Sequence, residues 1–329
     1  GLDALGYITN DTVFSQRKLP EKLIILGDKP SAIEFAQAFA QLGSKVTVVV
    51  SNDNILPQED PELVAKLKEV LISNGVSFYF NTTVQRAYSQ QQLKALECLH
   101  DSGESFVLHA DEIMVALGRK PNVEGLGLEN AGVNYSEQGI IVNKKLTTSQ
   151  KHIFALGDVI RSPYKLTNAA EYQASIVLSN AVFRYPAKVK YQGFPYVIFT
   201  DPEYAHVGLT ELQAKEQGYK HLDVLRFEFK DLDSAIIKNV PVGLIKVITS
   251  HERIIGVTIL GAHASVLIAE WGLALNTGAK LSDVASTIHA YPTLAQINRR
   301  VASKRATKGL FSQANKRLVA FLQRTFVWA

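Results

Sequence analysis

Residues 23–50, LIILGDKPSAIEFAQAFAQLGSKVTVVV, constrain the fold of this chain more than any other stretch. Leu23–Leu26 is a short apolar run that ends at a glycine, Ile33–Leu42 has apolar residues at helical spacing, and Val46–Val50 is a second apolar run. Such runs predict buried strands, and the spacing between them predicts a helix that Gly43 ends. The stretch therefore predicts one right-handed βαβ unit, the core of a doubly wound α/β domain.

The turn between the first strand and the helix decides whether such a unit binds a dinucleotide. A dinucleotide site has the motif GxGxxG here, because the pyrophosphate lies against backbone N–H groups at the helix N-terminus. Gly27, Lys29 and Ala32 occupy the three glycine positions, so only the first glycine is kept. Lys29 either blocks the approach of the phosphates or supplies a compensating positive charge. Nucleotide binding and a purely structural turn both remain open.

The end of the second strand normally carries the acidic residue that binds the adenosine ribose of NAD. Val50 stands there, and Ser51, Asn52 and Asp53 follow it. An arginine near this place would indicate the 2'-phosphate of NADP, but none lies between Ser51 and Gln58. The sequence therefore predicts NAD or NADP as the nucleotide without choosing between them.

Further elements of the same domain follow along the chain. Asp60 and Pro61 predict the N-cap and the first position of a helix. The apolar spacing of that helix predicts a buried face made of Leu63, Val64, Leu67, Val70 and Leu71. Val76–Phe80 and Glu112–Leu117 predict two more strands, and Leu93–Leu108 predicts a hairpin that turns at an Asp-Ser-Gly sequence.

Residues 139–193 predict a smaller segment with a helix at Asn168–Phe183 and a strand, IFALGD, at Ile153–Asp158. A strand that ends in Gly-Asp suits a ligand, because parallel sheets bind ligands at the carboxyl ends of their strands. The alternative is that the Asp158 side chain caps the next element.

From Phe194 on, the pattern changes to that of an antiparallel sheet with helices. The predicted strands are Tyr196–Phe199, Leu222–Phe229, Gly243–Thr249 and Arg253–Ile259. A helix rich in alanine, leucine and isoleucine is predicted at Ala264–Asn276. This region predicts an α+β domain whose apolar side fits either a subunit interface or a core.

Composition excludes several classes of protein. The 329 residues are 47% hydrophobic and 20% charged, which is typical of a globular protein with two or three domains. No run of about eighteen apolar residues is present, and no secretory signal opens the sequence. Cys98 is the only cysteine, so we expect no internal disulfide and no redox pair of thiols, and we expect Cys98 itself to be an inert buried strand residue.

Six stretches of the chain resemble one family in the same order and at the same spacing. They are LIILGDKPSAIEFA, ILPQEDPEL, ALGRKPN, IFALGDV, FTDPEYAHVGLTE and HAYPTLAQ, and together they extend over nearly the whole chain. These stretches are similar to the pyridine nucleotide-disulfide oxidoreductases, which include dihydrolipoamide dehydrogenase, glutathione reductase and mercuric reductase. The resemblance implies a homodimer whose subunits have an FAD domain, an NAD(P) domain and a C-terminal interface domain.

The resemblance also implies roles for particular residues. Asp158, which follows Gly157, would bond the ribityl chain of the flavin, and the backbone N–H groups of Leu166 and Thr167 would face its pyrimidine ring. Glu34 would lie close to the reactive edge of the flavin. The residues expected around the nicotinamide nucleotide are Gly27, Lys29, Pro30, Ser31, Ala32, Val50 and Gly118.

The chain departs from the family in two ways. The family's first FAD motif and its redox cysteine pair both precede the point where this sequence starts. Because the first residue is Gly1 and the only methionine is Met114, we expect part of the protein to lie upstream.

The second departure concerns the acid/base pair that serves the thiols across the family's dimer, a histidine with a glutamate five residues later. Tyr291 and Gln296 hold these positions. A tyrosine is a poor base at neutral pH because its ordinary pKa is near 10. His289 either takes the role or is structural. Tyr291 is similar to the tyrosine of mercuric reductases, but the C-terminal cysteines of those enzymes are absent, so we do not expect mercury chemistry.

The end of the chain is basic, although the net charge of the whole chain is only +4, and no acidic residue follows Asp283. Its basic residues are Arg299, Arg300, Lys304, Arg305, Lys308, Lys316, Arg317 and Arg324. Apolar residues at helical spacing, Leu310, Phe311, Ala314, Leu318, Phe321, Leu322 and Thr325, predict a basic amphipathic helix before Phe326 and Trp328. This helix either packs on its own interface domain or contacts an anionic membrane surface. We expect no nucleic-acid binding, because no reader motif is present.

The fold prediction is an α/β protein with a doubly wound NAD(P)-type Rossmann domain, a remnant of an FAD domain and a C-terminal α+β dimerisation domain. The predicted parts are a connector at 1–20, an NAD(P)-binding domain at 21–138, the C-terminal part of an FAD-binding domain at 139–193, a dimerisation domain at 194–309 and a basic amphipathic tail at 310–329.

The functional prediction is the C-terminal portion of a flavin-dependent NAD(P)H oxidoreductase of the disulfide reductase type. Its cofactors would be FAD, with a site that is incomplete in this chain, and NAD or NADP, with no metal. The alternative is a catalytically degenerate relative that acts as a binding or scaffold subunit, and IFALGD with the interface domain disfavours a plain Rossmann dehydrogenase. We expect a cytoplasmic homodimer, with membrane association through the tail as a further alternative.

Overall fold

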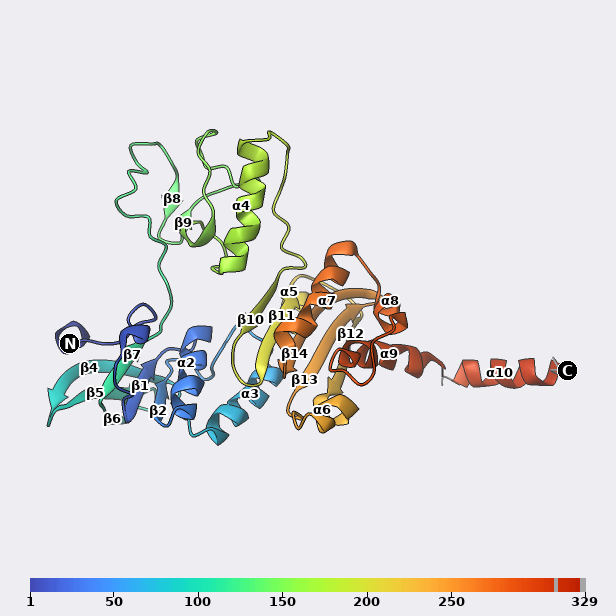
Figure 1. The fold of residues 1–329 in the computed structure, drawn as a ribbon, viewed down its shortest axis with the longest axis horizontal. Coiled ribbons are helices and arrows are strands. Elements are labelled where there is room, and N and C mark those ends of the chain that lie inside the picture. The colour runs from blue at the N-terminus through green and yellow to red at the C-terminus, as the bar shows by residue number, and fades with distance from the viewer. Residues whose placement is uncertain (311–312, 326–329) are drawn as a thin grey trace. The chain divides into compact units, whose positions relative to one another are not determined.

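The computed structural model describes residues 1–310 and 313–325, and the chain forms two compact units. The larger unit contains residues 1–117 together with the chain from 192 onward, and the smaller unit contains residues 118–191 (Figure 1). Phe311, Phe326 and Trp328 of the predicted tail lie outside the described residues.

The predicted βαβ unit is confirmed as part of a parallel sheet in the order β3-β2-β1-β7. Its strands are β1 (Lys22–Leu26), β2 (Lys45–Val49), β3 (Ser77–Tyr79) and β7 (Glu112–Val115). Leu26 is opposite Val49 on one side and Val115 on the other, so the three carboxyl ends lie side by side. The helices of this region are α2 (Pro30–Gln41) and α3 (Pro61–Ser73).

The N-cap predicted for α3 is confirmed. The Asp60 carboxylate accepts hydrogen bonds from the N–H groups of Glu62 and Leu63, and Pro61 occupies the first turn, where its missing N–H costs nothing. Of the predicted face, Val70 is half-buried and the other four residues are buried.

A second, antiparallel sheet in the order β4-β5-β6 contains the predicted hairpin. Its strands are β4 (Thr82–Gln90), β5 (Leu93–His100) and β6 (Ser105–Ala110). We did not predict β4, because its sequence TTVQRAYSQ is polar and buries only Thr82 and Ala87. An edge strand of this kind lacks the apolar alternation that identifies a strand.

The first twenty residues, predicted as a connector, contain α1 (Leu2–Leu5) and a 3₁₀ turn, η1 (Val13–Ser15). Between them Ile8 pairs in parallel with Met114 of β7, and its side chain is buried in the core beside the sheet. This segment therefore contributes to the edge of the parallel sheet.

The C-terminal part of the larger unit is built on a five-stranded antiparallel sheet in the order β10-β11-β14-β13-β12. The strands are β10 (Pro195–Ile198), β11 (Glu203–Gly208), β12 (Leu222–Glu228), β13 (Leu244–Ser250) and β14 (Arg253–Gly261). The helices are α5 (Glu211–Glu216), α6 (Asp233–Ile237), α7 (Ala264–Thr277), α8 (Leu281–Ser286), α9 (Gln296–Leu310) and α10 (Gln313–Thr325), with a 3₁₀ turn η3 (Phe229–Asp231). All four predicted strands and the helix α7 are confirmed, and β11 is an additional strand.

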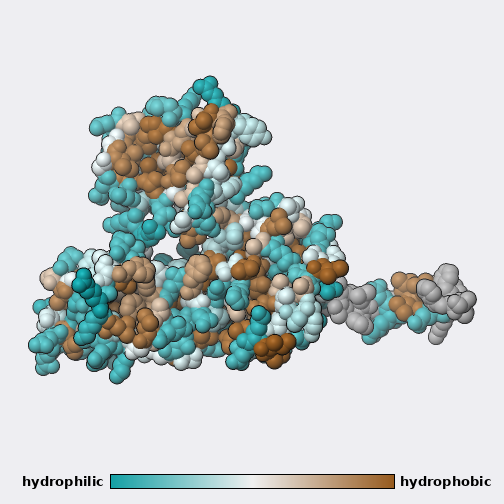
Figure 2. Space-filling view, viewed as in Figure 1, coloured by the Kyte–Doolittle hydropathy of each residue, from teal (hydrophilic) through white to brown (hydrophobic). Residues whose placement is uncertain are grey.

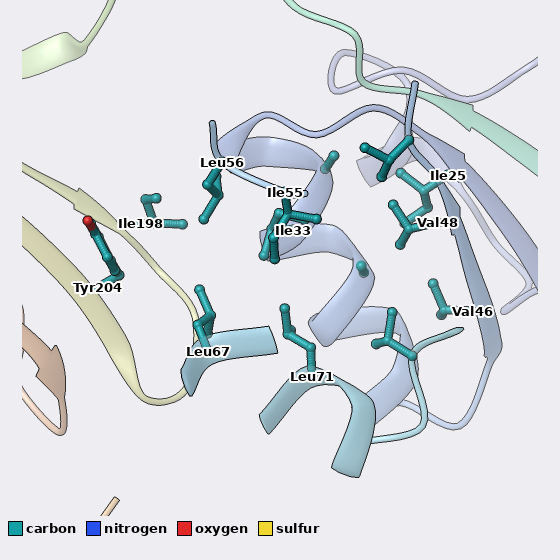
Figure 3. Packing of buried hydrophobic residues seen from close by; sticks show 14 of the residues in the cluster. Ile25, Ile33, Val46, Val48, Ile55, Leu56, Leu67, Leu71, Ile198 and Tyr204 are labelled. Atoms are coloured by element: carbon teal, nitrogen blue, oxygen red, sulfur yellow. The ribbon is translucent and has the colours of Figure 1, made fainter. Parts of the chain in front are cut away.

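The parallel sheet and the five-stranded sheet of the larger unit share one hydrophobic core. Figure 3 shows Ile198 and Tyr204 of the C-terminal sheet facing Leu67 of α3 and Ile33 of α2. Because these side chains belong to a single buried cluster, the nucleotide-type domain and the C-terminal α+β domain pack into one body.

A buried ion cluster joins the same two parts. The Lys246 ammonium on β13 lies 2.8 Å from the Asp60 carboxylate and 3.2 Å from each of the Glu62 and Glu211 carboxylates. Burial alone would lower the pKa of Lys246, but these carboxylates outweigh it and raise the pKa above its usual value. The Tyr204 hydroxyl accepts a hydrogen bond from the Asp60 N–H at 2.9 Å. The N-cap residue of α3 is thus also the anchor of the C-terminal sheet.

Helix α2 is attached to the C-terminal sheet by a second set of polar contacts. The Gln37 amide donates to the Asp201 carbonyl and accepts from the Asp201 N–H, and the Glu34 carboxylate accepts from the Phe199 N–H. Both side chains bind the backbone of the segment that follows β10.

The smaller unit contains a short hairpin, β8 (Tyr135–Ser136) and β9 (Gly139–Ile140), a 3₁₀ turn η2 (Gly157–Val159) and the predicted helix as α4 (Thr167–Ala181). Leu128 and Val133 pack in the same cluster as Ile140, Leu146 and Ala155. Residues 118–138, which we placed with the nucleotide domain, therefore pack with the segment that follows them. The division into functional domains stays a prediction.

We expect Lys246→Met to destabilise the chain by about 3–5 kcal/mol, because it leaves the buried Asp60 carboxylate without its cation. Urea unfolding followed by circular dichroism measures the difference. The control is Lys66→Met, which removes a partly exposed ion pair with Glu228 and should cost less than about 1 kcal/mol. Similar small losses in both variants would show that the cluster does not join the two sheets.

Candidate functional site

The turn after β1 requires the glycine that the sequence keeps. Gly27 has φ +139°, and a Cβ atom there would lie 2.4 Å from the carbonyl oxygen of Ala116. Any other residue would strain the backbone and clash with the chain that follows β7. Gly27 therefore lets the ends of β1 and β7 approach each other.

Lys29 occupies the second glycine position without strain. It is the N-cap residue of α2, with φ −83° and ψ 164°, an extended conformation open to any residue. Its ammonium lies 3.5 Å from the carboxylate of Asp28, which also accepts a hydrogen bond from the Asn52 amide at 2.5 Å. The backbone of the turn is thus compatible with a dinucleotide site, and the side chain of Lys29 places a cation beside the start of the helix.

The next three predicted contacts begin α2. Pro30 occupies the first turn, Ser31 is half-buried, and Ala32 is fully buried in the core. The first N–H groups of a helix have no partner within the helix and favour an anion. Ala32 can offer a ligand only its backbone.

The position of Val50 argues against a contact with a nucleotide. Its side chain is fully buried, its N–H donates to the Tyr79 carbonyl, and its carbonyl accepts from the Thr82 N–H. The exposed residue at the end of β2 is Ser51. Ser51 lines a cleft of about 530 Å³ that also includes Gly27, at the carboxyl ends of β1, β2 and β7.

In the smaller unit, Asp158 is held by two basic residues. The Arg119 guanidinium lies 2.8 Å from the Asp158 carboxylate, and the Lys165 ammonium donates to the Asp158 carbonyl at 2.8 Å. Gly157 has φ +75°, and its N–H donates to the Gln173 side chain, which is buried. The Asp158 side chain caps neither η2 nor α4, so the predicted capping role is wrong. The strand predicted at Ile153–Asp158 is also wrong, because this segment forms only one isolated bridge, at Phe154, and the start of η2.

Leu166 is the N-cap residue of α4, and Thr167 is its first helical residue. Their backbone N–H groups therefore lie at the end of a fifteen-residue helix, where donors without intrahelical partners are found. Gly118 has φ +139° and begins the smaller unit.

The residues at the family's acid/base positions do not form a pair. Tyr291 is exposed, and its hydroxyl donates to the Asp233 carboxylate at 3.2 Å. Gln296 is buried at the start of α9. Asp233, on α6, is a partner of Tyr291 that we did not foresee from the sequence.

His289 is held by contacts on both sides of its ring. One ring nitrogen lies 3.0 Å from the Thr287 carbonyl, and the other lies 3.0 Å from the Glu270 carboxylate. The same carboxylate accepts from the Asn298 amide, whose oxygen accepts from the buried Trp271 indole. Both ring nitrogens of His289 thus have an oxygen partner within the same domain.

Glu34 lies on α2 and is partly buried. Burial raises the pKa of its carboxyl, partly opposed by the hydrogen bond from the Phe199 N–H. A carboxyl with a raised pKa is a candidate for proton transfer near neutral pH.

Cys98 is inert, as predicted. It is fully buried in β5, and burial raises the pKa of its thiol to about 11. Across residues 1–310 and 313–325, no three histidine, cysteine, aspartate or glutamate side chains are grouped to hold a metal ion. A search of the same residues for a helix long and apolar enough to cross a membrane finds none.

The structure places the predicted residues in separate groups. Gly27, Lys29, Pro30 and Ser31 lie together at the start of α2, and the flavin residues of the smaller unit lie around Asp158. The partners Asp28 and Arg119 were missed. Their signal was present, because each directly follows a glycine that we had singled out.

Comparison with known proteins agrees with this arrangement. Residues 2–174 match the pyridine nucleotide-disulphide oxidoreductase family model, and residues 194–301 match the dimerisation domain of the same family. The chain is 34% identical over 290 residues to a dihydrolipoyl dehydrogenase of Geobacillus stearothermophilus, covering 87% of this chain and 60% of that protein. It is 31% identical to a mercuric reductase of Lysinibacillus sphaericus, covering 90% of this chain and 54% of that protein.

Among solved structures, the HOCl-induced flavoprotein disulfide reductase RclA of Escherichia coli is similar, with a TM-score of 0.82 and 26% identity. The match covers 91% of this chain and 68% of that one. The chain spans about 60% of the length of the dihydrolipoyl dehydrogenases it matches. Since the family model matches more than half of the sequence, this chain belongs to the pyridine nucleotide-disulphide oxidoreductase family.

Proposed function

We propose that the chain is the C-terminal portion of an FAD- and NAD(P)H-dependent oxidoreductase that passes a hydride from nicotinamide to flavin. The observation that carries the proposal is the turn at Gly27 and Lys29, which opens into a cleft at the carboxyl ends of three parallel strands. Ligands of open α/β sheets bind at this edge.

The residues of the larger unit fit a nicotinamide nucleotide. Gly27 keeps the turn open, the first turn of α2 favours a phosphate, and the Lys29 ammonium adds positive charge next to it. We expect the positive charge of Lys29 to make up for the missing second glycine. The extended backbone at this position is open to any residue, so the position does not require a glycine.

The residues of the smaller unit fit part of a flavin site. Asp158 would accept from the hydroxyls of the flavin side chain, Leu166 and Thr167 would donate from the start of α4, and Arg119 would hold the Asp158 carboxylate in place. When bound, the flavin supplies the acceptor for the hydride. In the larger unit, burial raises the pKa of the Glu34 carboxyl, which suits proton exchange.

The surface of the smaller unit supports the proposal that it is part of a larger domain. Helix α4 fully buries only Ala169 and Gln173 among its fifteen residues. Figure 2 shows apolar side chains gathered on the visible face of this unit, the upper part of the view. The exposed large apolar residues include Leu126, Ile141, Leu178, Val182, Phe183 and Tyr185. A face of this kind normally packs against further structure.

A second candidate, a binding or scaffold subunit without catalysis, is favoured by one observation. The hydroxyl of Tyr291 binds Asp233, His289 binds Glu270, and Gln296 is buried, so the family's acid/base positions hold no base. A chain of this kind would lack the family's base for thiol chemistry across a dimer and would still have the turn proposed to bind a nucleotide.

We expect the chain to bind NADH or NADPH in the micromolar range, and we expect Lys29→Glu to weaken that affinity at least tenfold, because it places a negative charge beside the phosphates. Isothermal titration calorimetry measures both. Lys45→Glu, at the opposite end of the sheet, is the control. If Lys29→Gly binds more tightly than the parent chain, Lys29 blocks the site; if no variant binds either nucleotide, the scaffold proposal takes precedence.

We propose that two copies of the chain form a homodimer through the domain at 194–301. Val266, Ala269 and Leu273 form an exposed apolar stripe along α7, at a spacing that repeats every three to four residues. Ile288, after α8, is 89% exposed. Apolar side chains on a domain of this family are expected to meet their copies across a twofold axis.

The Leu273→Glu variant should sediment as a monomer, whereas the parent chain sediments at twice the chain mass, because the new carboxylate would be buried at the twofold interface. Analytical ultracentrifugation separates the two forms. Leu212→Glu changes an exposed leucine of α5 and should remain dimeric. A parent chain that is monomeric at all concentrations contradicts the proposal.

A contact between the tail and an anionic membrane surface is a separate proposal. Leu318, Val319 and Leu322 of α10 are exposed. Lys316 and Arg317 on the same helix are also exposed. Exposed apolar and basic residues on one helix fit the surface of an anionic bilayer.

Vesicles that contain phosphatidylserine should bind the chain, and the double substitution Leu318→Glu and Leu322→Glu should abolish the binding, because it removes apolar area and adds repelling charge. Co-sedimentation measures the bound fraction. Neutral vesicles and the Leu212→Glu variant serve as controls. The proposal is contradicted if the parent chain does not bind the vesicles or if the double variant still binds them.

A further inference from the structure

We propose that Arg86 binds the 2'-phosphate of NADPH and makes the chain selective for NADPH over NADH. The inference rests on the proposed nucleotide site and adds the choice between the two nucleotides, which the sequence left open. It starts from the residues that line the cleft beside Gly27.

The residue directly after β2 is not the carboxylate that would favour NADH. NAD sites use a carboxylate after the second strand to accept hydrogen bonds from the ribose hydroxyls. Here Val50 is buried, and Ser51 is the residue after β2 that lines the cleft. Asp28 lines the cleft too, but its carboxylate already binds Asn52 and Lys29. Val49 and Ser51, which line the cleft at the end of β2, therefore offer a ribose 2'-hydroxyl no carboxylate; Asp53 does not line the cleft, and the other cleft carboxylate, Asp3, comes from α1.

The structure brings a cation to the cleft from a different strand. The hydrogen bond from the Thr82 N–H to the Val50 carbonyl attaches the start of β4 to the end of β2. Residues 82–87 of β4 line the cleft, and Arg86 is among them. This position of Arg86 could not be predicted from the sequence, because Arg86 lies thirty-five positions after Ser51 and on a strand whose polar sequence lacks apolar alternation.

The strand bends where Arg86 lies. The pairing of β4 with β5 shifts register between Val84 and Arg86, which leaves Gln85 as the extra residue of a bulge. Bulges bend a strand and change the direction of its side chains, and they are frequent beside binding sites. The bulge thus falls within the part of β4 that lines the cleft.

The Arg86 side chain is available for an anion. It is exposed, and its guanidinium lies over the ring of Tyr88 at 5.4 Å. Within the part of the chain that the structure describes, no carboxylate forms an ion pair with it. A guanidinium binds phosphate through two parallel hydrogen bonds, and its long stem can move between an aromatic ring and a phosphate.

The chemistry of the cleft therefore fits a ligand with an adenosine ribose phosphate. Ser51 supplies a hydroxyl at the end of β2, and Arg86 supplies the cation. An adenosine that carries only ribose hydroxyls would leave the guanidinium without a partner.

The probe for this inference is adenosine 2',5'-bisphosphate, which contains the 2'-phosphate but no nicotinamide, compared with adenosine 5'-monophosphate. Titration calorimetry of the full chain should give at least tenfold tighter binding of the bisphosphate, with a preference that decreases as salt is added. NADPH and NADH should show the same order.

The test variant is Arg86→Gln, which should weaken binding of the bisphosphate about tenfold and leave the monophosphate unchanged. Arg86→Lys should retain part of the preference, since it keeps the charge but loses the paired hydrogen bonds. Arg253→Gln, an exposed arginine of β14, is the control and should have no effect. Circular dichroism spectra that match the parent chain confirm that the variants fold.

The outcomes separate this inference from the proposed function. If both nucleotides bind equally, or if Arg86→Gln weakens both by the same factor, the inference is overturned while nucleotide binding stands. If no adenine nucleotide binds, the proposed function and this inference are both overturned.

Discussion

The larger unit depends on the buried ion cluster around Lys246. A lysine in the interior is stable only when carboxylates surround it, and here Asp60, Glu62 and Glu211 come from two parts of the chain that are far apart in sequence. Asp60 also caps α3, so one side chain both starts a helix of the parallel sheet and holds the antiparallel sheet. Any ligand contact on α2 is therefore fixed relative to the C-terminal domain.

The same rigidity explains why the turn at Gly27 and Lys29 keeps a backbone that is compatible with a dinucleotide site. Gly27 is fixed by its approach to Ala116, and α2 is held from the other side by the contacts of Glu34 and Gln37 with the segment after β10. Lys29 can then replace a glycine without changing the backbone. The loss of the glycine alters the charge of the site more than its geometry.

The family's acid/base positions depart from the family in a different way from the nucleotide turn, through the contacts that their side chains make. The His289 ring contacts the Glu270 carboxylate, and the Tyr291 hydroxyl donates to the Asp233 carboxylate. Each carboxylate orients its partner and occupies a polar atom of it. The polar atoms of both side chains are thus bound within the C-terminal domain. A protein that transfers hydride without thiol chemistry, or one that only binds nucleotide, is compatible with this arrangement.

The elements whose signals are local could be predicted from the sequence. The apolar runs around α2, the N-cap at Asp60 and the hairpin of β5 and β6 depend on neighbouring residues, and all three were predicted. The resemblance to the family could also be recognised from the sequence, because the family's motifs are short stretches of contiguous sequence. Tertiary structure alone decided that β4 is a strand, that residues 118–138 pack with the smaller unit, and that Arg86 lies in the same cleft as Ser51. These facts depend on contacts between residues far apart in sequence, and such contacts leave no periodic signal in the chain.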